Sequence, residues 1–359
     1  MVNETVESSV KGKWIRVPAL PVDDKHLVVK GKWLKMATVH DEEWLETELA
    51  DPKVAIAGLK GNRSKGFRAD IFHFTQKLPE TRPKYSYHIE WESVAAASTS
   101  DFTAWWKSLP QETRKNVRRS HKCGVVITVK ELDDDLICGI VGVNNDSTIR
   151  QNLPNTHYGK NFEQVWRDQT AFADRTVFIC AYHGDELIGF LRMVYRGNIA
   201  AILQLLPKTS HQDKRPANAL VAKAVELCAE KGISHLTYGL FNYGKKRHNS
   251  LREFKERNGF VEILMPRYYI PLSAWGMLCL KCKVHLGLHG ILPHSVIMFV
   301  VNIRAKWYNL KQLISRCSLK AEQPNRNRQV ECSNPPAGSN PPRGVPSADS
   351  ITPKPSTAN

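Results

Sequence analysis

Apolar and polar positions follow a regular rhythm in the second half of the chain. Turn sequences H-G-D and R-G-N separate the first three apolar runs there, as between strands of a meander. The pattern predicts strands at 176–182, 187–195, 199–206, 235–241 and 260–270, and helices at 133–143, 161–174, 216–231 and 250–258. Helical and strand runs in this order predict a mixed α/β layer, with a helical crossover between the third and fourth strands.

The first half is less regular. Its apolar runs predict strands at 54–59, 69–75, 85–91 and 125–132, and helices at 41–49, 101–109 and 110–123. The sequence V-K-G-K-W occurs twice, at 10–14 and 29–33. This spacing predicts two strands of one antiparallel ribbon rather than a repeat architecture.

The C-terminal part changes character twice. A helical segment is predicted over 273–317, and the following 318–359 contain eight Pro and almost no large apolar residues. Such a composition cannot offset the entropy of ordering, so we expect a disordered tail. The apolar run 295–303 is too short to span a bilayer. It predicts a helix buried against the domain or, alternatively, peripheral membrane contact through 291–307.

The charge balance points to an anionic partner. The chain has 359 residues, 51 of them Lys or Arg and 35 Asp or Glu, which gives a net charge of +16. The tail holds five basic and three acidic residues and contributes +2, so the rest carries +14. A folded part this basic suggests nucleic acid, a phosphate-rich cofactor or anionic lipid as partner; a basic surface kept for solubility is the alternative.

Cysteine usage and hydropathy suggest a cytoplasmic protein. The N-terminus has no apolar core of a signal peptide, and no apolar run approaches about 20 residues. We expect reduced, mostly buried thiols at Cys123, Cys138, Cys180, Cys228, Cys279, Cys282, Cys317 and Cys332. The chain could also lie peripherally at the inner membrane face.

Two local motifs add a resemblance to a family. The stretch L-P-Q-E-T-R-K-N-V-R-R-S-H-K-C-G-V-V at 109–126 resembles the basic helix of Fem-type transferases, and L-R-E-F-K-E-R-N-G at 251–259 resembles their F-K-x-x-x-G segment. The element order over 105–272 is similar to the GNAT acyltransferase fold. The chain therefore resembles a FemAB-like protein, with a degenerate GNAT-like domain over 1–132 and a GNAT-like acyltransferase domain over 133–272. Fem-type proteins transfer an aminoacyl group from aminoacyl-tRNA to an amine of a peptidoglycan precursor.

The donor-binding turn departs from the acetyl-CoA pattern. GNAT proteins that use acetyl-CoA carry a glycine-rich turn here, whereas 204–219 contain no Gly. Lys214 and Arg215 still precede a helix that starts at Pro216, and a helix N-terminus attracts phosphate. The resemblance implies that donor-binding residues are Gln204, Lys214, Arg215 and Asn218; a basic loop with a capping Asn is the alternative.

A cluster of cations lies on the helix predicted at 110–123. Spacings of four residues bring like charges close together, which is tolerable where a polyanion binds. The candidate anion-binding residues are Arg114, Lys115, Arg118, Arg119 and Lys122. The alternative is a solvated helix face.

Acyl transfer to an amine needs proton donation to the leaving group and stabilisation of an oxyanion. Tyr243 follows the fourth strand of the second domain, and Lys255 matches the Lys of F-K-x-x-x-G, which in Fem-type proteins lies near the transferred acyl group. With Tyr238 they are the catalytic candidates; Lys245 and Lys246 lie beside them in sequence. A packed aromatic and an exposed helix Lys are the alternatives.

A metal site is not expected. Cys279, Cys282, His285 and His289 lie on one predicted helix, where ten residues rise about 15 Å. Four ligands spread over that length cannot meet at one tetrahedral ion.

The leading hypothesis is an acyltransferase that moves an acyl or aminoacyl group onto an amine, with a cell-envelope precursor as a suggested acceptor. No bound cofactor is expected, and acyl-CoA or aminoacyl-tRNA would be a co-substrate. Backbone N–H groups near Gln204 would polarise the carbonyl. The alternative is a catalytically silent GNAT-like module that binds RNA or an anionic membrane.

Overall fold

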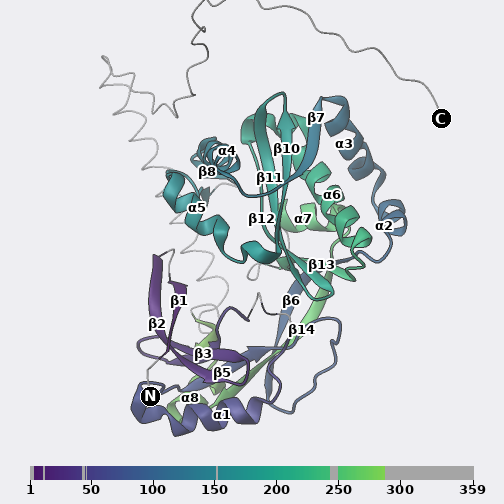
Figure 1. Cartoon of the computed structure of the whole chain (residues 1–359). Helices are drawn as coiled ribbons and strands as arrows, with labels where there is room; N and C mark the ends of the chain where they lie inside the picture. The colour runs from purple at the N-terminus through teal and green to yellow at the C-terminus, as the bar shows by residue number, and fades with distance from the viewer. Residues whose placement is uncertain are drawn as a thin grey trace, which may run out of the picture. The chain divides into compact units, whose positions relative to one another are not determined.

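A computed structural model describes residues 4–10, 13–42, 45, 47–150, 153–242 and 250–287 (Figure 1). Its main feature is a 12-stranded mixed sheet with the order β1-β2-β3-β4-β5-β14-β6-β13-β12-β11-β10-β7. The strands are β1 (Thr5–Val10), β2 (Lys13–Val22), β3 (Lys25–Lys30), β4 (Met36–Val39), β5 (Ile71–Thr75), β6 (His88–Ser98), β7 (Val125–Lys130), β10 (Thr176–His183), β11 (Glu186–Arg196), β12 (Ile199–Pro207), β13 (His235–Leu240) and β14 (Val261–Pro271). A separate two-stranded ribbon pairs β8 (Ile149–Arg150) with β9 (Leu153–Pro154).

Helices cover the sheet and connect its strands. They are α1 (Pro52–Gly61), α2 (Phe102–Ser108), α3 (Gln111–Lys122), α4 (Asp134–Asn145), α5 (Phe162–Thr170), α6 (Pro216–Glu230), α7 (Ser250–Arg257) and α8 (Ala274–Lys281). Short 3-10 turns add η2 (Arg63–Lys65), η3 (Ala173–Arg175), η4 (Thr209–Lys214) and η5 (Val284–Leu286). The mixed α/β class expected from the sequence is confirmed, and most predicted elements of the second half lie within a few residues of their observed bounds.

Strand order interleaves the two halves of the chain. β14, near the C-terminal end of the described chain, pairs antiparallel with both β5 and β6. β6, from the first half, also pairs antiparallel with β13 of the second. Each half therefore completes its own part of the sheet with a strand of the other, which joins the two parts through continuous backbone hydrogen bonding.

Parallel pairing occurs at two places in this sheet. β4 runs parallel to β5, with α1 in the connection, and β12 runs parallel to β13, with α6 in the connection. Each parallel ladder covers three residue pairs. The two halves thus repeat the same strand–helix–strand unit, as expected for tandem GNAT-like folds.

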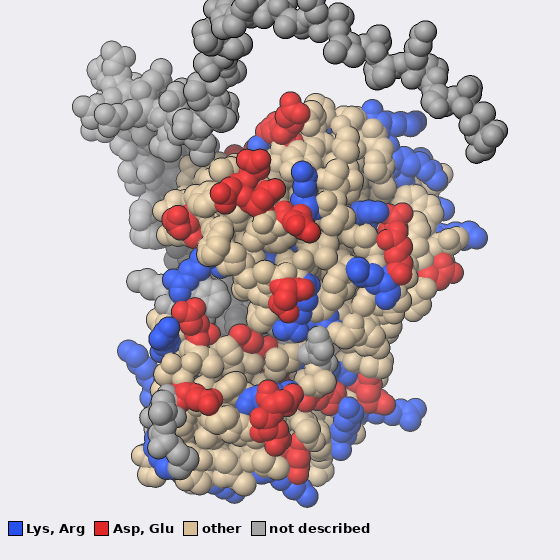
Figure 2. Space-filling view, viewed as in Figure 1, with Lys and Arg blue, Asp and Glu red and all other residues tan. Residues whose placement is uncertain are grey.

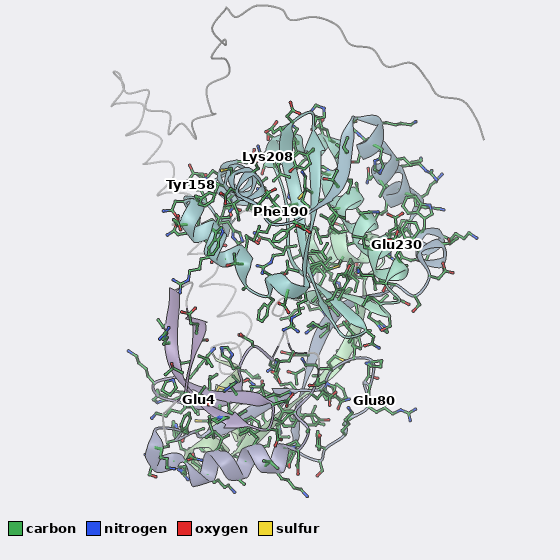
Figure 3. The ribbon with its side chains drawn as sticks, viewed as in Figure 1. Glu4, Glu80, Tyr158, Phe190, Lys208 and Glu230 are labelled. Carbon is green, nitrogen blue, oxygen red and sulfur yellow. The ribbon has the colours of Figure 1, made fainter. Side chains whose placement is uncertain are left out.

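The three largest of four apolar clusters among the described residues hold most of these layers together. In the second half, one cluster fills the space between the sheet and α2, α3 and α6, and includes Trp105 and Val225. Another packs α4 and α5 on the opposite face, where Phe190 lies fully buried (Figure 3). The third buries Phe72 and Leu59 under α1 in the first half. At about 25 cal/mol per Å² of buried apolar surface, such clusters are the main source of stability.

Two predictions in the first half are wrong. Residues 54–59 form part of α1 rather than a strand, because Asp51 caps the Lys53 N–H and Pro52 occupies the first turn. Ala55 and Leu59, four residues apart, then face the core. The described residues of the predicted helix 41–49 contain no α-helix.

The V-K-G-K-W ribbon also differs from expectation. β1 ends at Val10 and β2 begins at Lys13, so the first copy lies where two strands meet. β3 ends at Lys30, and Gly31 has a positive φ of 105°. A side chain at Gly31 would meet the Leu34 carbonyl, which explains the glycine of the second copy. The two copies therefore do not pair with each other, although β2 and β3, which contain part of each copy, form an antiparallel pair as expected.

Candidate active site

The parallel pair β12–β13 opens after three residues. Ala201 and Thr237 are the last paired residues, yet β12 continues to Pro207 and β13 to Leu240. A register shift against β11 also makes Leu203 an extra residue on β12. Backbone groups of β12 beyond the ladder therefore have no described strand partner on the β13 side, so they are available to a ligand.

Lys255 of α7 lies at this opening. Its side chain is fully buried, and Nζ donates hydrogen bonds of 2.6 Å to the carbonyls of Tyr238 and Leu240. The same nitrogen lies 4.5 Å from the centroid of the Tyr238 ring. Burial lowers the pKa of Lys255 to about 8. The structure therefore brings together Lys255 and Tyr238, two of the three residues predicted as catalytic. The lowered pKa allows Lys255 to release a proton near neutral pH.

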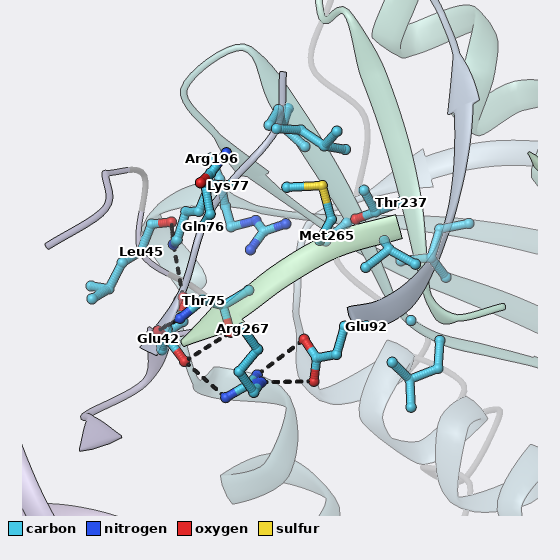
Figure 4. Close-up of a pocket in the computed structure, with 17 residues that line it drawn as sticks. Glu42, Leu45, Thr75, Gln76, Lys77, Glu92, Arg196, Thr237, Met265 and Arg267 are labelled. Atoms are coloured by element: carbon cyan, nitrogen blue, oxygen red, sulfur yellow. Dashed lines mark hydrogen bonds and ion pairs between the residues drawn. The ribbon is translucent and has the colours of Figure 1, made fainter. Parts of the chain in front are cut away.

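A pocket of about 220 Å³ adjoins the opening (Figure 4). The last ladder pair, Ala201 and Thr237, lines one side of it, and Leu240, which accepts from Lys255, lines it too. The other walls come from β5, β6, β11 and β14 and from the loops after β4 and β5. The remaining lining residues are Glu42, Leu45, Thr75, Gln76, Lys77, Leu78, Glu92, Val94, Arg196, Ile199, Ile202, Gly239, Met265 and Arg267.

A buried ion network forms the polar wall of this pocket. Arg267 donates from Nε and Nη2 to the two carboxylate oxygens of Glu92, at 2.9 and 3.2 Å, and its Nη1 lies 3.4 Å from Glu42 Oε2 (Figure 4). The Thr75 N–H donates to Glu42 Oε1 at 2.5 Å. Burial raises the pKa of Glu42, although the Arg267 charge opposes the shift. Glu42 and Glu92 raise the pKa of Arg267 despite its burial.

Lys77 adds a second cation with an altered pKa. Its Nζ donates to the carbonyls of Glu42, at 2.8 Å, and Leu45. Burial lowers its pKa to about 8, helped by the Arg196 charge. The pocket therefore combines one carboxylate, Glu42, and one amine, Lys77, whose pKa values are shifted toward neutrality, as in sites of general acid–base chemistry.

The N-terminus of α6 has the features of an anion site. Arg215 occupies the cap position with a φ of 56°, and no side chain caps the helix. Lys214 is half-buried and lies 3.6 Å from Asp213, whereas Arg215 is exposed. The Asn218 side chain instead donates to Asn258 Oδ1 at 3.1 Å, so it links α6 to the end of α7.

Gln204 faces a different cavity. Its Oε1 accepts from Gln169 Nε2 at 3.0 Å, and both residues line a polar pocket of about 230 Å³ between the sheet and α4 and α5. The guanidinium of Arg192 donates there to the carbonyl oxygens of Asp168, at 2.7 Å, and Ala171. Burial lowers its pKa to about 10. The side chain of Gln204 thus serves this cavity, while its backbone belongs to the open part of β12.

The predicted basic residues lie on the outer face of α3. The helix buries Thr113, Val117 and Ser120. Lys115, Arg118, Arg119 and Lys122 are exposed, and Arg114 is half-buried. Lys and Arg side chains gather over this part of the molecule in Figure 2. The guanidinium of Arg118 lies 6.0 Å from the Trp106 ring. The arrangement suits contact with an extended anion.

Several predicted features lie outside the described residues. These are Tyr243 with Lys245 and Lys246, His289, the segment 291–307 and the tail 318–359. Conversely, sequence reasoning missed Glu42, Lys77, Glu92 and Arg267. Glu42 and Arg267 are 225 positions apart, and no local motif joins them. Only the interleaved sheet brings them together.

Comparison with known proteins supports the fold. Residues 147–260 match the model of the acetyltransferase (GNAT) family. L-PGS from Bacillus licheniformis matches with a TM-score of 0.50 at 12% identity, covering 74% of this chain and 87% of that one. The C-terminal domain of a protein assigned as a lysylphosphatidylglycerol synthetase from Agrobacterium fabrum also has a TM-score of 0.50 at 12% identity, with 75% and 88% covered. A comparison with proteins of curated function found no match.

The family match confirms the GNAT-type unit expected in the second half, and the two solved structures have a fold similar to that of this chain. The matched residues lie in the second half, and the first half repeats its parallel strand–helix–strand unit. At 12% identity the likeness extends to the fold alone. Among the described residues, no helix is both long and apolar enough to cross a bilayer.

Proposed function

We propose that the chain is an acyltransferase that moves an acyl or aminoacyl group from an activated, anionic donor to an amine. The observation that carries the proposal is the open β12–β13 pair, with a buried lysine at its edge and a polar pocket beside it. A donor in the opening would meet free backbone groups of β12 on one side. The acceptor would bind in the pocket, against the wall formed by Glu42, Glu92 and Arg267.

Acyl transfer in this arrangement needs one bond formed and one broken. The acceptor nitrogen attacks the acyl carbon, and the oxyanion is stabilised by N–H groups of β12 beyond Ala201. Collapse of this intermediate breaks the C–O or C–S bond to the donor. Lys255, with its pKa near 8, gives a proton to the leaving oxygen or sulfur, and a carboxylate of the pocket accepts the proton lost by the amine.

The donor's phosphates would be held at the uncapped N-terminus of α6. Free helix N–H groups together with Lys214 and Arg215 favour a phosphate there. The turn before α6 lacks glycine, which argues against a tight acetyl-CoA cradle and favours a larger donor such as aminoacyl-tRNA. The basic face of α3 supports a nucleic-acid donor, because it offers further phosphate contacts.

The acceptor is proposed to be a component of the cell envelope. The Fem-type resemblance supports a peptidoglycan-precursor amine as the acceptor. The name of one structural neighbour, a lysylphosphatidylglycerol synthetase, suggests a lipid headgroup as the alternative, whose attacking group would be a hydroxyl instead of an amine. The same basic helix would support the alternative, an inactive module that binds RNA or anionic membrane.

The test is transfer of labelled amino acids from a pool of charged tRNA to peptidoglycan-precursor amines, with acetyl-CoA as a competing donor. Phosphatidylglycerol vesicles, which offer a hydroxyl, test the alternative acceptor. We expect transfer from charged tRNA, lost in Lys255→Met and retained in Lys107→Met, an exposed lysine of α2. Absence of transfer from every donor, together with tight tRNA or vesicle binding, would favour the binding module instead.

A further inference from the structure

His285 of η5 has an unusual environment. Its side chain has no solvent exposure, and within the described ranges neither ring nitrogen has a hydrogen-bond partner of normal geometry, although the backbone of Cys279 interacts with the imidazole. A buried imidazole without partners is costly, because both nitrogens lose their bonds to water. The ring is held by Tyr269 of β14, whose centroid lies 4.7 Å away. The imidazole is therefore placed to take a further polar partner.

Two residues of β6 meet this imidazole. His285 Nε2 lies 3.8 Å from Glu90 Oε1, and that oxygen lies 3.3 Å from His88 Nε2. His88 and Glu90 are two positions apart on a strand, so both project from the same face of the sheet. One ligand atom from each residue lies within 4.8 Å of the others.

We propose that His88, Glu90 and His285 form a binding site for a divalent transition-metal ion of the zinc class. Two imidazoles and one carboxylate are ligands that Zn²⁺ accepts, with bonds of about 2.0 to 2.2 Å. Tetrahedral coordination at that length places ligand atoms about 3.3 to 3.5 Å apart. The His88–Glu90 distance already has this value, whereas His285 Nε2, at 3.8 Å from Glu90 Oε1, has to move inward. A fourth position remains for water or another donor.

The charges around the site permit a cation. Arg267, which pairs in register with Glu90 across β6 and β14, is neutralised by Glu92 and Glu42. Glu90 itself makes contacts only with the two histidines among the interactions described. Among these interactions the Glu90 carboxylate has no Lys or Arg partner, and a metal ion between the two histidines would balance its charge.

The site would attach η5 to the sheet. The residues joined are nearly 200 positions apart, and η5 follows α8 directly. β6 carries Glu92 and Val94, which line the pocket, on the same face a few residues further along. A bound ion would fix both the C-terminal end of the described chain and the strand that presents Glu92.

The test is zinc titration of the full chain after removal of any affinity tag and chelator treatment. We expect one equivalent of Zn²⁺ with a micromolar or lower Kd, and a rise of a few degrees in Tm at saturation. Co²⁺ should give visible absorption bands of a site with four or five ligands.

Variants distinguish this site from other ligands. His285→Ala and Glu90→Gln should each weaken binding at least tenfold, and Glu90→Gln leaves the packing of His285 intact. The matched control is His26→Ala, which removes an exposed histidine 3.0 Å from Glu4 and should change nothing.

Several results would overturn the proposal. They are less than 0.2 equivalents of bound zinc (roughly the background of incomplete loading), unchanged affinity in both site variants, or an equal loss in His26→Ala. Loss of binding in Cys282→Ser with full retention in His88→Ala would likewise overturn it, since the ion would then be held by the α8 cysteine.

Discussion

The two parallel strand pairs of the sheet, β4–β5 and β12–β13, share a strand–helix–strand connection but differ at the ends of their ladders. At β4–β5, Glu42 closes the end of the ladder by accepting from the Thr75 N–H, and α1 is capped by its own Asp51. At β12–β13 the strands separate beside a pocket, and α6 begins with no side-chain cap. The same supersecondary unit therefore ends in a closed ladder in one half and in an open ladder in the other.

The difference lies in where backbone polar groups find partners. In the first half they are satisfied by side chains of the chain itself. In the second half Lys255 satisfies two carbonyls of β13, while N–H groups at the start of α6 stay available. A site for an anionic substrate needs such unsatisfied donors, and a scaffold does not tolerate them. Substitutions in the first half and in the second half should therefore differ in their effects on stability and on activity.

The largest expected effect is that of Lys255→Met. The variant leaves the carbonyls of Tyr238 and Leu240 without a donor, at a cost of about 2 to 4 kcal/mol in unfolding free energy. Transfer activity should fall about a hundredfold or more, because the leaving group loses its proton donor. Urea unfolding and single-turnover kinetics measure the two effects. Activity within threefold of wild type would remove Lys255 from the mechanism.

Glu42→Ala tests whether the Glu42 carboxylate closes the end of the β4–β5 ladder. Arg267 and the Thr75 N–H lose a partner in a buried setting, and we expect a loss of about 2 to 3 kcal/mol in stability. Arg267 keeps Glu92, which limits the loss. The exposed variant Glu80→Ala serves as control. Equal stability of both variants in chemical denaturation would show that Glu42 does not close the ladder.

The two helix N-termini give a matched pair. Lys214→Gln with Arg215→Gln should weaken donor binding about tenfold, or about 1.4 kcal/mol, and leave folding unchanged. Asp51→Ala should cost about 1 kcal/mol of stability, by loss of the cap on α1, and leave donor binding unchanged. Calorimetry measures donor binding and thermal melts measure stability. Together they show whether each variant changes only one of the two. Similar behaviour of the two sites would contradict the comparison.

The pH dependence of stability follows from the pKa of Lys255. Burial lowers it from 10.5 to about 8, so between these values the unfolded chain binds more protons than the folded one. Stability should therefore rise with pH across this window relative to Lys255→Met. Lys77 titrates in the same range but is present in both proteins, so the difference isolates Lys255. A flat difference curve between pH 8 and 10.5 would contradict the buried cation.

The smallest effect on folding is expected for α3. Replacing Arg114, Arg118 and Lys122 with Gln should change Tm little, because these side chains lie on the outer face. The salt dependence of tRNA or anionic-vesicle binding should flatten, since fewer counterions are released. Gln at Lys53, Lys60 and Lys65, exposed in the first half, is the control. Equal slopes for both triple variants would mark α3 as a solvated face.

Predictability differed between the two halves for a physical reason. The second half is built from long, periodic segments whose burial follows sequence order, so its strands and helices could be predicted. Residues 54–59 have an apolar pattern that suits either state, and the Asp51 cap with Pro52 decided for a helix. The turn glycine of the second V-K-G-K-W copy was likewise mistaken for part of a strand.

The candidate site likewise has a part that could be predicted from the sequence and a part that could not. Lys255 belongs to a local motif, and a helix that follows an open strand brings it to Tyr238, which lies within 20 positions in the sequence. Tyr243 lies outside the described residues, so its role remains a prediction. Glu42, Glu92 and Arg267 carry no motif, because their meeting depends on β14 pairing with strands of the other half.

The sequence by itself determined the α/β class, the basic face of α3 and the GNAT-type order of the second half. These depend on local periodicity, charge spacing and turn residues, which act over a few neighbours. The tertiary structure alone decided the interleaved sheet, the ion network of the pocket and the meeting of His285 with His88 and Glu90. Contacts between distant segments depend on strand order, and strand order is fixed by the burial of whole faces rather than by any local pattern.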